Sequence, residues 1–216
     1  NRPERHNSLV PALLDSLIAD IEAAAKADVR ALVLRANGRS FSTGGDVGAF
    51  FDVPQGERAE YGARIVGALN RAILALLDLP FPVIGRVHGP VTGGSLGLVL
   101  ACDLVAVTPD AFFQPYYVDV GFSPDGGWTA LLPERIGAAR ARMVQLLNRR
   151  INAAEAAEWG IATALVAADD LDRTIAGWLE TLASKVPSAI AATKARLLTP
   201  ERRSAYDAAL EAERTG

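Results

Sequence analysis

Apolar residues recur along the chain with two different periods, and these periods predict alternating helices and strands. The first helix is predicted over residues 11–25, with Pro11 in its first turn. Its apolar positions follow the i, i+3, i+4, i+7 spacing of one helix face: Leu14, Leu17, Ile18 and Ile21. A second long helix is predicted over residues 58–77, because Pro80 and Pro82 stop it before the next apolar run.

Short apolar runs predict buried strands over residues 31–34 and 83–87, after these two helices, and over residues 104–107. A polar, glycine-rich loop over residues 37–46 follows the first strand, and a Gly89-Pro90 turn and a short helix from Gly94 follow the second. Because strands recur between helices, the predicted fold class is α/β. It is built from parallel β-α units with ligands at the carboxyl ends of the strands.

Beyond the third strand, short strands alternate with helices, and the end of the chain is predicted to be helical. Asn152 and Glu155 have the spacing of a capping pair at a helix start, and Pro187 suits the first turn of a later helix. No repeat or linker interrupts the sequence. We therefore predict a core over residues 1–186 and a C-terminal helical region over residues 187–216 that takes part in oligomerisation.

Composition and charge narrow the classes of function. The 216 residues are 50% hydrophobic but only 6% aromatic, so a sizeable core of mostly aliphatic side chains is expected. The formal net charge of −3 gives no basic surface for nucleic acid. The single cysteine forms no intramolecular disulfide, and the two histidines lie far apart, so no metal site is expected. No apolar run is long enough to span a membrane and no signal peptide opens the chain, which favours a soluble cytoplasmic protein.

Two glycine-rich turns carry the first candidate chemistry. They cover residues 41–46 and 91–97, and each follows a predicted buried strand. Glycine lets main-chain N–H groups approach a ligand without a Cβ in the way. Two such turns that face one pocket would make a two-donor oxyanion hole. Taken alone, each is more simply an ordinary tight turn, and neither has the full G-x-G-x-x-G spacing of a dinucleotide site.

The order of the motifs is more specific than any single motif. An Asn-Arg-Pro turn opens the chain, and after the two glycine-rich turns comes a Gly-Phe-Ser-Pro-Asp-Gly-Gly run. In this order the motifs resemble the crotonase (enoyl-CoA hydratase/isomerase) superfamily. The resembling stretches extend over essentially the whole chain: residues 1–9, 38–47, 87–103, 121–127, 132–133 and 156–160. The strand that usually precedes the Asn-Arg-Pro turn and part of the C-terminal helical region are missing, so we expect an incomplete sequence or trimmed ends.

The resemblance implies a fold, a substrate class and a set of site residues. The fold is a crotonase-like spiral of β-β-α units, usually assembled as a homotrimer or homohexamer, and the substrate is an acyl-CoA thioester. The main-chain N–H groups of Gly45 and Gly94 match the family's oxyanion donors. Substrate and CoA are expected at six positions, largely through main-chain atoms: Ser42, Gly45, Asp46, Val47, Gly94 and Tyr117. The reaction needs no metal, and coenzyme A enters only as part of the substrate.

Two positions depart from the hydratase pattern of this family. Its hydratases use two glutamates to hold and deprotonate water, and the resembling positions here are Gly97 and Tyr117. Neither side chain is a carboxylate, and losing one general acid/base typically lowers a rate by about 10²–10⁴-fold. Ordinary hydration is therefore disfavoured.

Asp125 is the candidate that replaces both glutamates. Its position resembles the aspartate used by dienoyl-CoA isomerase, by 4-chlorobenzoyl-CoA dehalogenase and by the phenylacetate-pathway ring-epoxide isomerase, which is the branch with the closest pattern. Tyr117 is placed to hydrogen-bond it. The alternative is that Asp125 only caps the helix that follows it. Of the other aspartates, Asp46 is expected to hold the first glycine-rich loop in place, and Asp119 to lie on the surface of an extended 118–120 segment.

The favoured function is double-bond isomerisation of an enoyl-CoA. Asp125 removes a proton from C2 and returns it at C4, while the two glycine N–H groups stabilise the enolate. The enzyme alternatives are an acyl-CoA thioester or C–X hydrolase with Asp125 as nucleophile, and a conventional enoyl-CoA hydratase. The non-enzyme alternative is a CoA- or RNA-binding homologue with a vestigial site, and the negative net charge speaks against RNA.

Overall fold

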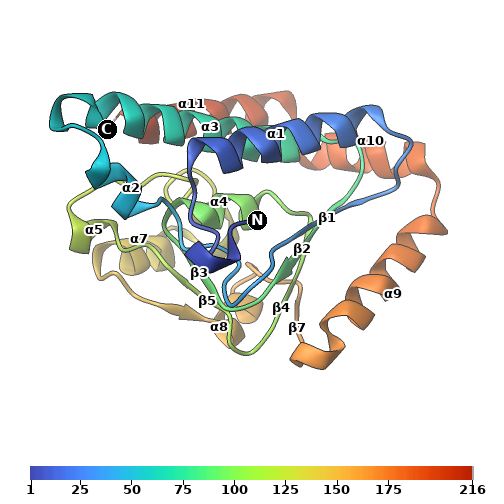
Figure 1. Ribbon diagram of the computed structural model, residues 1–216. Coiled ribbons are helices and arrows are strands. Elements are labelled where there is room, and N and C mark those ends of the chain that lie inside the picture. Colours follow the sequence, from blue (N-terminus) through green and yellow to red (C-terminus); the bar gives the residue numbers. More distant parts are fainter. Residues whose placement is uncertain (216) are drawn as a thin grey trace.

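Two small β-sheets form the centre of the computed structural model, which describes residues 1–215 (Figure 1). The first sheet has four parallel strands in the order β1-β2-β4-β7. Their bounds are β1 Leu32–Arg35, β2 Val83–Val87, β4 Leu104–Val107 and β7 Ala164–Leu165. The two central strands are almost entirely apolar and buried, as expected for a parallel sheet that is covered on both faces.

The second sheet has three strands in the order β3-β5-β6, namely β3 Pro90–Thr92, β5 Phe112–Gln114 and β6 Ile151–Asn152. β2 leads directly into β3 and β4 leads into β5, so each of these two turns of the chain adds one strand to each sheet. This alternation is the predicted β-β-α spiral. β3 was not predicted, because three residues that include a proline carry too little periodicity to indicate a strand.

The helices surround these sheets. Their bounds are α1 Pro11–Lys26, α2 Val47–Asp52, α3 Arg58–Asp78, α4 Leu96–Leu100, α5 Tyr117–Val120, α6 Leu132–Ile136, α7 Ala138–Leu146, α8 Ala153–Glu158, α9 Leu171–Ala183, α10 Pro187–Leu197 and α11 Pro200–Thr215. Single 3₁₀ turns precede several of them: η1 Pro3–Arg5, η2 Gln55–Glu57, η3 Gly93–Ser95 and η4 Ala168–Asp170. α3 packs between α1 and α11 in one layer, and α9 covers the opposite side against β2 and β4 (Figure 1).

Most sequence predictions of elements are confirmed. The two long helices, α1 and α3, each end one residue beyond the predicted end, and β2 and β4 have the predicted bounds. The capping pair is present: the Asn152 side chain accepts from the Glu155 N–H at 2.9 Å, and the Glu155 carboxylate accepts from the Asn152 N–H at 3.1 Å. Pro187 opens α10 as predicted.

The segment around Asp119 differs from the prediction. Valines on both sides of Asp119 favoured an extended chain, but residues Tyr117–Val120 form one helical turn, α5. Tyr116 before this turn has φ 65° and Gly121 after it has φ 75°, so left-handed residues turn the chain at both ends. Asp119 accepts a hydrogen bond from the Asn148 side chain, which keeps it away from the interior.

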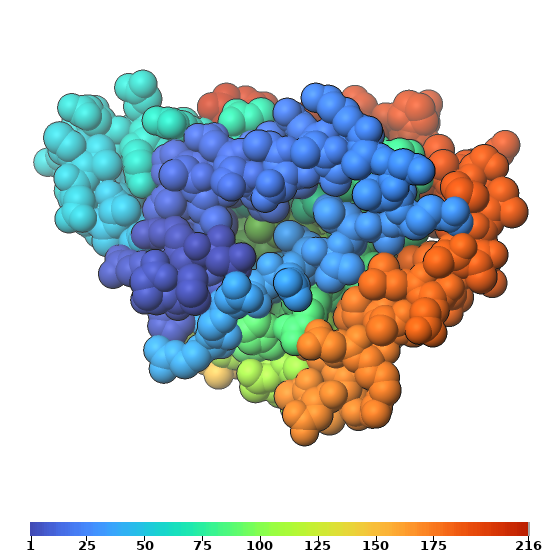
Figure 2. Space-filling model, turned by 45° about the vertical axis from the view of Figure 1, so that its right-hand side comes forward, coloured from blue at the N-terminus to red at the C-terminus, as the bar shows by residue number. Residues whose placement is uncertain are grey.

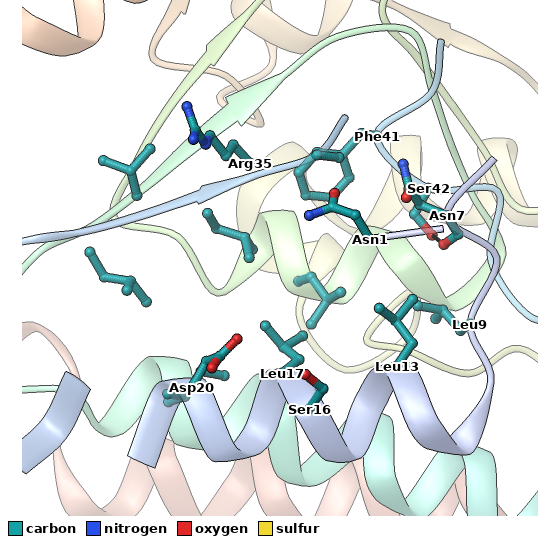
Figure 3. Close-up of a pocket in the computed structure, with 16 residues that line it drawn as sticks. Asn1, Asn7, Leu9, Leu13, Ser16, Leu17, Asp20, Arg35, Phe41 and Ser42 are labelled. Carbon is teal, nitrogen blue, oxygen red and sulfur yellow. Dashed lines mark hydrogen bonds between the residues drawn. The ribbon is translucent and has the colours of Figure 1, made fainter. Parts of the chain in front are cut away.

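An apolar cavity of about 270 Å³ lies between α1 and β1. Leu13 and Leu17 reach into it from α1, opposite Phe41 (Figure 3). In the space-filling view, α1 and the segment that leads to β1 cross one face of the molecule, beside α9 and α10 in orange (Figure 2).

Candidate active site

A cavity of about 600 Å³ lies among the two glycine-rich loops, helices α2, α3 and α5, and the end of α11. It brings together six of the predicted site residues: Gly45, Asp46, Val47, Gly94, Tyr117 and Asp125. The rest of its wall is largely apolar, with side chains that include Phe50, Ile65, Val66, Leu69, Val120 and Phe122. Such a cavity suits an apolar ligand that carries a few polar groups.

The two glycine-rich loops lie side by side, as predicted. Ser42 forms a β-bridge with Val91, and the Thr92 N–H donates to the Ser42 carbonyl at 3.1 Å. The contact is close because Gly44 has no side chain: a Cβ there would lie 2.6 Å from the Thr92 carbonyl oxygen. The loops therefore meet at the wall of one cavity, which is the arrangement that a two-donor oxyanion hole requires.

The main-chain N–H groups of Gly45 and Gly94 sit at this wall. The Leu9 N–H donates to the Gly44 carbonyl, and the Asp46 N–H donates to the Leu9 carbonyl. Because these two groups on either side of Gly45 face Leu9, the Gly45 N–H points away from Leu9. Gly94 lies in the first turn of η3, where a helix leaves its N–H groups without an intrahelical acceptor. Both groups are thus placed as candidate donors to a ligand in the cavity.

Asp46 holds the first loop in place, as expected. Its carboxylate accepts from Arg2 at 3.1 Å, from Arg5 at 3.2 Å and from the Ser8 hydroxyl at 3.1 Å. It also caps α2 by accepting from the Ala49 N–H at 3.1 Å. Burial alone would raise the pKa of Asp46, but these hydrogen bonds lower it to about 2. The carboxylate is fully engaged, so the part of Asp46 that is free to face the cavity is its main chain.

Ser42 is the predicted site residue that the structure places elsewhere. Its side chain is buried, and its hydroxyl donates to the Asn7 carbonyl at 2.8 Å. It borders the smaller cavity beside α1, where it lies near Asn7 (Figure 3). Ser42 thus supports the loop from behind.

Asp125 projects into the main cavity beside the second loop. The Tyr117 hydroxyl donates to its Oδ1 at 2.7 Å, which confirms the predicted hydrogen bond. Asp125 also lies against Gly94, because a Cβ on that glycine would lie 2.4 Å from Oδ1. Burial raises the pKa of Asp125 to about 6; the Tyr117 hydrogen bond opposes this shift and the charge of Glu213 adds to it. The pKa of Tyr117 is raised well above 10, first by burial and then by the Asp125 charge, so its hydroxyl remains a donor.

The alternative that Asp125 caps a helix does not hold in this structure. Residues 126–130 form a turn, and the Gly127 N–H, which a cap at position 125 would bind, donates to Glu213 of α11 instead. Sequence reasoning missed Glu213, because one glutamate on a polar helix face carries no signal for a partner so far away along the chain. Its burial, at 8% exposed, is the structural signal that sets it apart.

The sequence model of the enoyl-CoA hydratase/isomerase family matches residues 1–215. The chain belongs to this family. Its relatives include the putative enoyl-CoA hydratase/isomerase YhaR of Bacillus subtilis, which is 30% identical over 78% of this chain and 65% of the relative. The trans-2-decenoyl-[acyl-carrier-protein] isomerase of Streptococcus mutans is 30% identical over 80% of this chain and 66% of the relative. A 4-chlorobenzoyl coenzyme A dehalogenase of an Arthrobacter species is 32% identical over 81% of this chain and 63% of the relative.

Solved structures of the family have the same fold. An enoyl-CoA hydratase from Mycobacterium avium subsp. paratuberculosis has a TM-score of 0.87 and 32% identity, covering 100% of this chain and 82% of that one. An enoyl-CoA hydratase/isomerase from Xanthobacter autotrophicus has a TM-score of 0.88 and 30% identity, covering 100% and 81%. The chain spans less than two thirds of the length of the curated relatives named above. Among residues 1–215, no helix combines the length and the apolar character needed to cross a membrane.

The two positions that resemble the glutamates of family hydratases differ in how much room they leave. A Cβ on Gly97 would lie 2.3 Å from the main-chain oxygen of Gly126 and 2.3 Å from Ile73. The turn after Asp125 therefore occupies the space that a side chain at position 97 would need. Tyr117 instead fills its position with a ring whose hydroxyl binds Asp125. Neither of these two positions therefore supplies a carboxylate, and the carboxylate that lies beside Gly94 is that of Asp125.

Proposed function

We propose that this protein isomerises the double bond of an enoyl thioester, with coenzyme A as the thiol carrier. One observation carries the proposal: Asp125 lies against Gly94 in a largely apolar cavity that also contains Gly45. An isomerase of this kind needs one acid/base group, because the base that removes the proton becomes the acid that returns it.

The acyl thioester is proposed to bind with its carbonyl oxygen between Gly45 and Gly94. The N–H groups of these residues would donate to the oxygen as negative charge develops on it. The acyl chain would extend along the apolar wall formed by Ile65, Leu69 and Phe122. Phe122 packs edge-on against Phe50 with ring centroids 5.4 Å apart, so this wall offers aromatic as well as aliphatic contacts.

The proton transfer follows from the position and acidity of Asp125. With a pKa of about 6, its carboxylate is mostly ionised at neutral pH and accepts a proton from C2 of a 3-enoyl thioester. The electrons of the C–H bond move into the thioester and give a dienolate whose negative oxygen faces the two glycines. Protonated Asp125 then donates the same proton to C4, and the double bond ends between C2 and C3. No metal or redox cofactor takes part in this sequence.

A conventional hydratase is the second candidate, because relatives with 36% identity are named as probable enoyl-CoA hydratases. The packing at Gly97 argues against it. A hydrolase with Asp125 as nucleophile is supported by the 32% identity to the Arthrobacter dehalogenase. The dehalogenase-like branch of the family also uses a histidine base. Neither histidine of this chain lines the cavity, which argues against the hydrolase. We also propose that the chain belongs to the ring-epoxide isomerase branch of the family, whose sequence pattern around Asp125 it resembles.

Assays with purified protein and a panel of 3-enoyl, 2-enoyl and aryl thioesters test the proposal. The proposed activity gives a 2-enoyl thioester from a 3-enoyl thioester, without change in the mass of the protein. A covalent acyl-enzyme at Asp125, visible as a mass increase, would support the hydrolase instead. Binding of acyl-CoA without turnover of any thioester would support a binding protein with a vestigial site.

We also propose a homotrimer or homohexamer. Leu146 and Leu147, at the end of α7, are 73% and 72% exposed, and large apolar side chains that are so exposed are typical of contact surfaces. Light scattering of the purified protein measures the number of subunits.

A further inference from the structure

We propose that Glu213 is a positioning residue for Asp125: from α11 it clamps the turn over residues 126–130 and so fixes the Asp125 carboxylate against Gly94. This inference rests on the proposed function and adds to it the part played by the C-terminal helix. It also gives α11, within the predicted oligomerisation region, a direct role in the site of its own chain.

The contacts of Glu213 are numerous for one side chain. Its Oε2 accepts from the Gly127 N–H at 2.8 Å, and its Oε1 accepts from the Thr129 N–H at 2.8 Å and the Ala130 N–H at 3.0 Å. The Thr129 hydroxyl donates to the same Oε1 at 2.6 Å. Both carboxylate oxygens are therefore used within one turn, although the turn lies far from α11 in the sequence.

The turn needs an outside partner because of its own backbone. Gly126 has φ 61° and Gly127 has φ 85°, and two consecutive left-handed residues direct several N–H groups to one side. Glu213 binds those N–H groups, and buried N–H groups without an acceptor are strongly destabilising. A negatively charged acceptor is the partner that such a nest of N–H groups favours.

The same turn sets where Asp125 lies. A Cβ on Gly126 would lie 2.3 Å from the Gly94 Cα, so the turn packs directly on the second glycine-rich loop. Asp125 is then fixed on one side by this contact and on the other by the 2.7 Å hydrogen bond from Tyr117. If Glu213 released the turn, Gly126 would be free to move off Gly94, and Asp125 would move with it.

Glu213 also acts on Asp125 through its charge. The titratable and charged groups that line the cavity are Asp46, Tyr116, Tyr117, Asp125, Glu213 and Arg214. Asp46 is neutralised by two arginines, and Arg214 is paired with Glu211. Among residues 1–215, Glu213 is thus the negative group that faces Asp125 without a cationic partner, and it contributes to the raised pKa of Asp125. Removing its charge should shift the titration of Asp125 to lower pH.

The test compares Glu213→Gln with the matched control Glu201→Gln, which makes the same change on the exposed first turn of α11. In the ligand-free protein, NMR follows the titration of the Asp125 carboxyl carbon and the hydrogen exchange of the Gly127, Thr129 and Ala130 amides. We expect Glu213→Gln to lower the pKa of Asp125 and to speed exchange of these amides, and Glu201→Gln to change neither. With a 3-enoyl thioester, we expect Glu213→Gln to lower kcat by about 10- to 100-fold and to change KM less.

An Asp125 titration and amide exchange that are the same in Glu213→Gln as in the unsubstituted protein would overturn the proposal. If Glu213→Gln does not fold, Glu213→Asp replaces it, since it keeps the charge and shortens the reach. The proposal then predicts faster amide exchange with the Asp125 pKa still raised, and unchanged exchange would refute it. The NMR measurements need no substrate, so they decide the role of Glu213 even if the unsubstituted protein isomerises no thioester, a result that would count against the proposed function alone.

Discussion

Replacing Asp125 with asparagine should remove activity and, at the same time, stabilise the protein. The pKa of Asp125 is raised from 3.8 to about 6, so the folded state binds the proton more tightly than the unfolded state does. The ionised carboxylate therefore destabilises the fold. This effect is absent below pH 3.8, grows as the pH rises from 3.8 to 6, and is complete above pH 6. Asparagine has no charge to lose, and its amide oxygen still accepts from Tyr117.

The size of this effect follows from the pKa shift. One pKa unit corresponds to about 1.4 kcal/mol, so Asp125→Asn should raise the free energy of unfolding by about 3 kcal/mol at pH 8 and by about 1.5 kcal/mol at pH 5. The rate of 3-enoyl-CoA isomerisation should fall by about 10²-fold or more, because the variant has no proton carrier. The loss of activity and the gain in stability come from the same buried charge.

Urea unfolding of both proteins at pH 5 and pH 8, together with an isomerase assay at pH 8, measures these quantities. Circular dichroism and calorimetric binding of acetyl-CoA serve as controls, and both should be unchanged. A variant with full isomerase activity would remove Asp125 from the mechanism. A variant as stable as the unsubstituted protein at pH 8 would show that Asp125 is not held in a destabilised ionised form.

Three further predictions follow from the packing of the site. Crotonyl-CoA hydration should be slow or undetectable by the loss of enoyl absorbance, because neither Gly97 nor Tyr117 supplies a carboxylate; turnover within the usual enzyme range of about 1–10³ s⁻¹ would contradict this. Gly97→Glu should not restore hydration and should lower the free energy of unfolding by about 3 kcal/mol, since the side chain meets the Gly126 main chain. Urea unfolding and the hydration assay measure both effects, and a stable, active variant would show that the turn can move. Asp46→Asn should lower the free energy of unfolding by about 2 kcal/mol at pH 7, because the pKa of Asp46 is depressed to about 2. The difference in stability between the two proteins should vanish as the pH falls from 3.8 to 2. An unchanged free energy of unfolding at pH 7 would show that the arginine contacts contribute little.

The sequence was sufficient for the long elements and for six of the residues that line the cavity, but it did not indicate Glu213. α1, α3, β2 and β4 have strong apolar periods, and the ordered motifs placed Gly45, Gly94 and Asp125 within one family pattern. Short elements were harder, because a three-residue strand such as β3 or a single turn such as α5 carries almost no period. Tertiary contacts decide such elements.

The structure adds contacts between residues that the sequence does not link. The clamp of Arg2 and Arg5 on Asp46 joins two loops, and the bond of Glu213 to the Gly127 N–H joins α11 to the turn after Asp125. Neither of these contacts joins residues at a sequence spacing that would have indicated it. The lack of room for a side chain at position 97 could not be predicted either, because it depends on how closely Gly126 approaches α4 and not on the residue at 97 itself.

The most direct test of the account is a comparison of two reactions of the unsubstituted protein. A 3-enoyl-CoA and crotonyl-CoA of the same purity are incubated with it separately, and NMR identifies and times each product. The account predicts a 2-enoyl-CoA from the first substrate, at a rate at least about 10²-fold above formation of 3-hydroxybutyryl-CoA from the second. Hydration as fast as isomerisation, or hydration alone, would contradict a site that works with one carboxylate at Asp125.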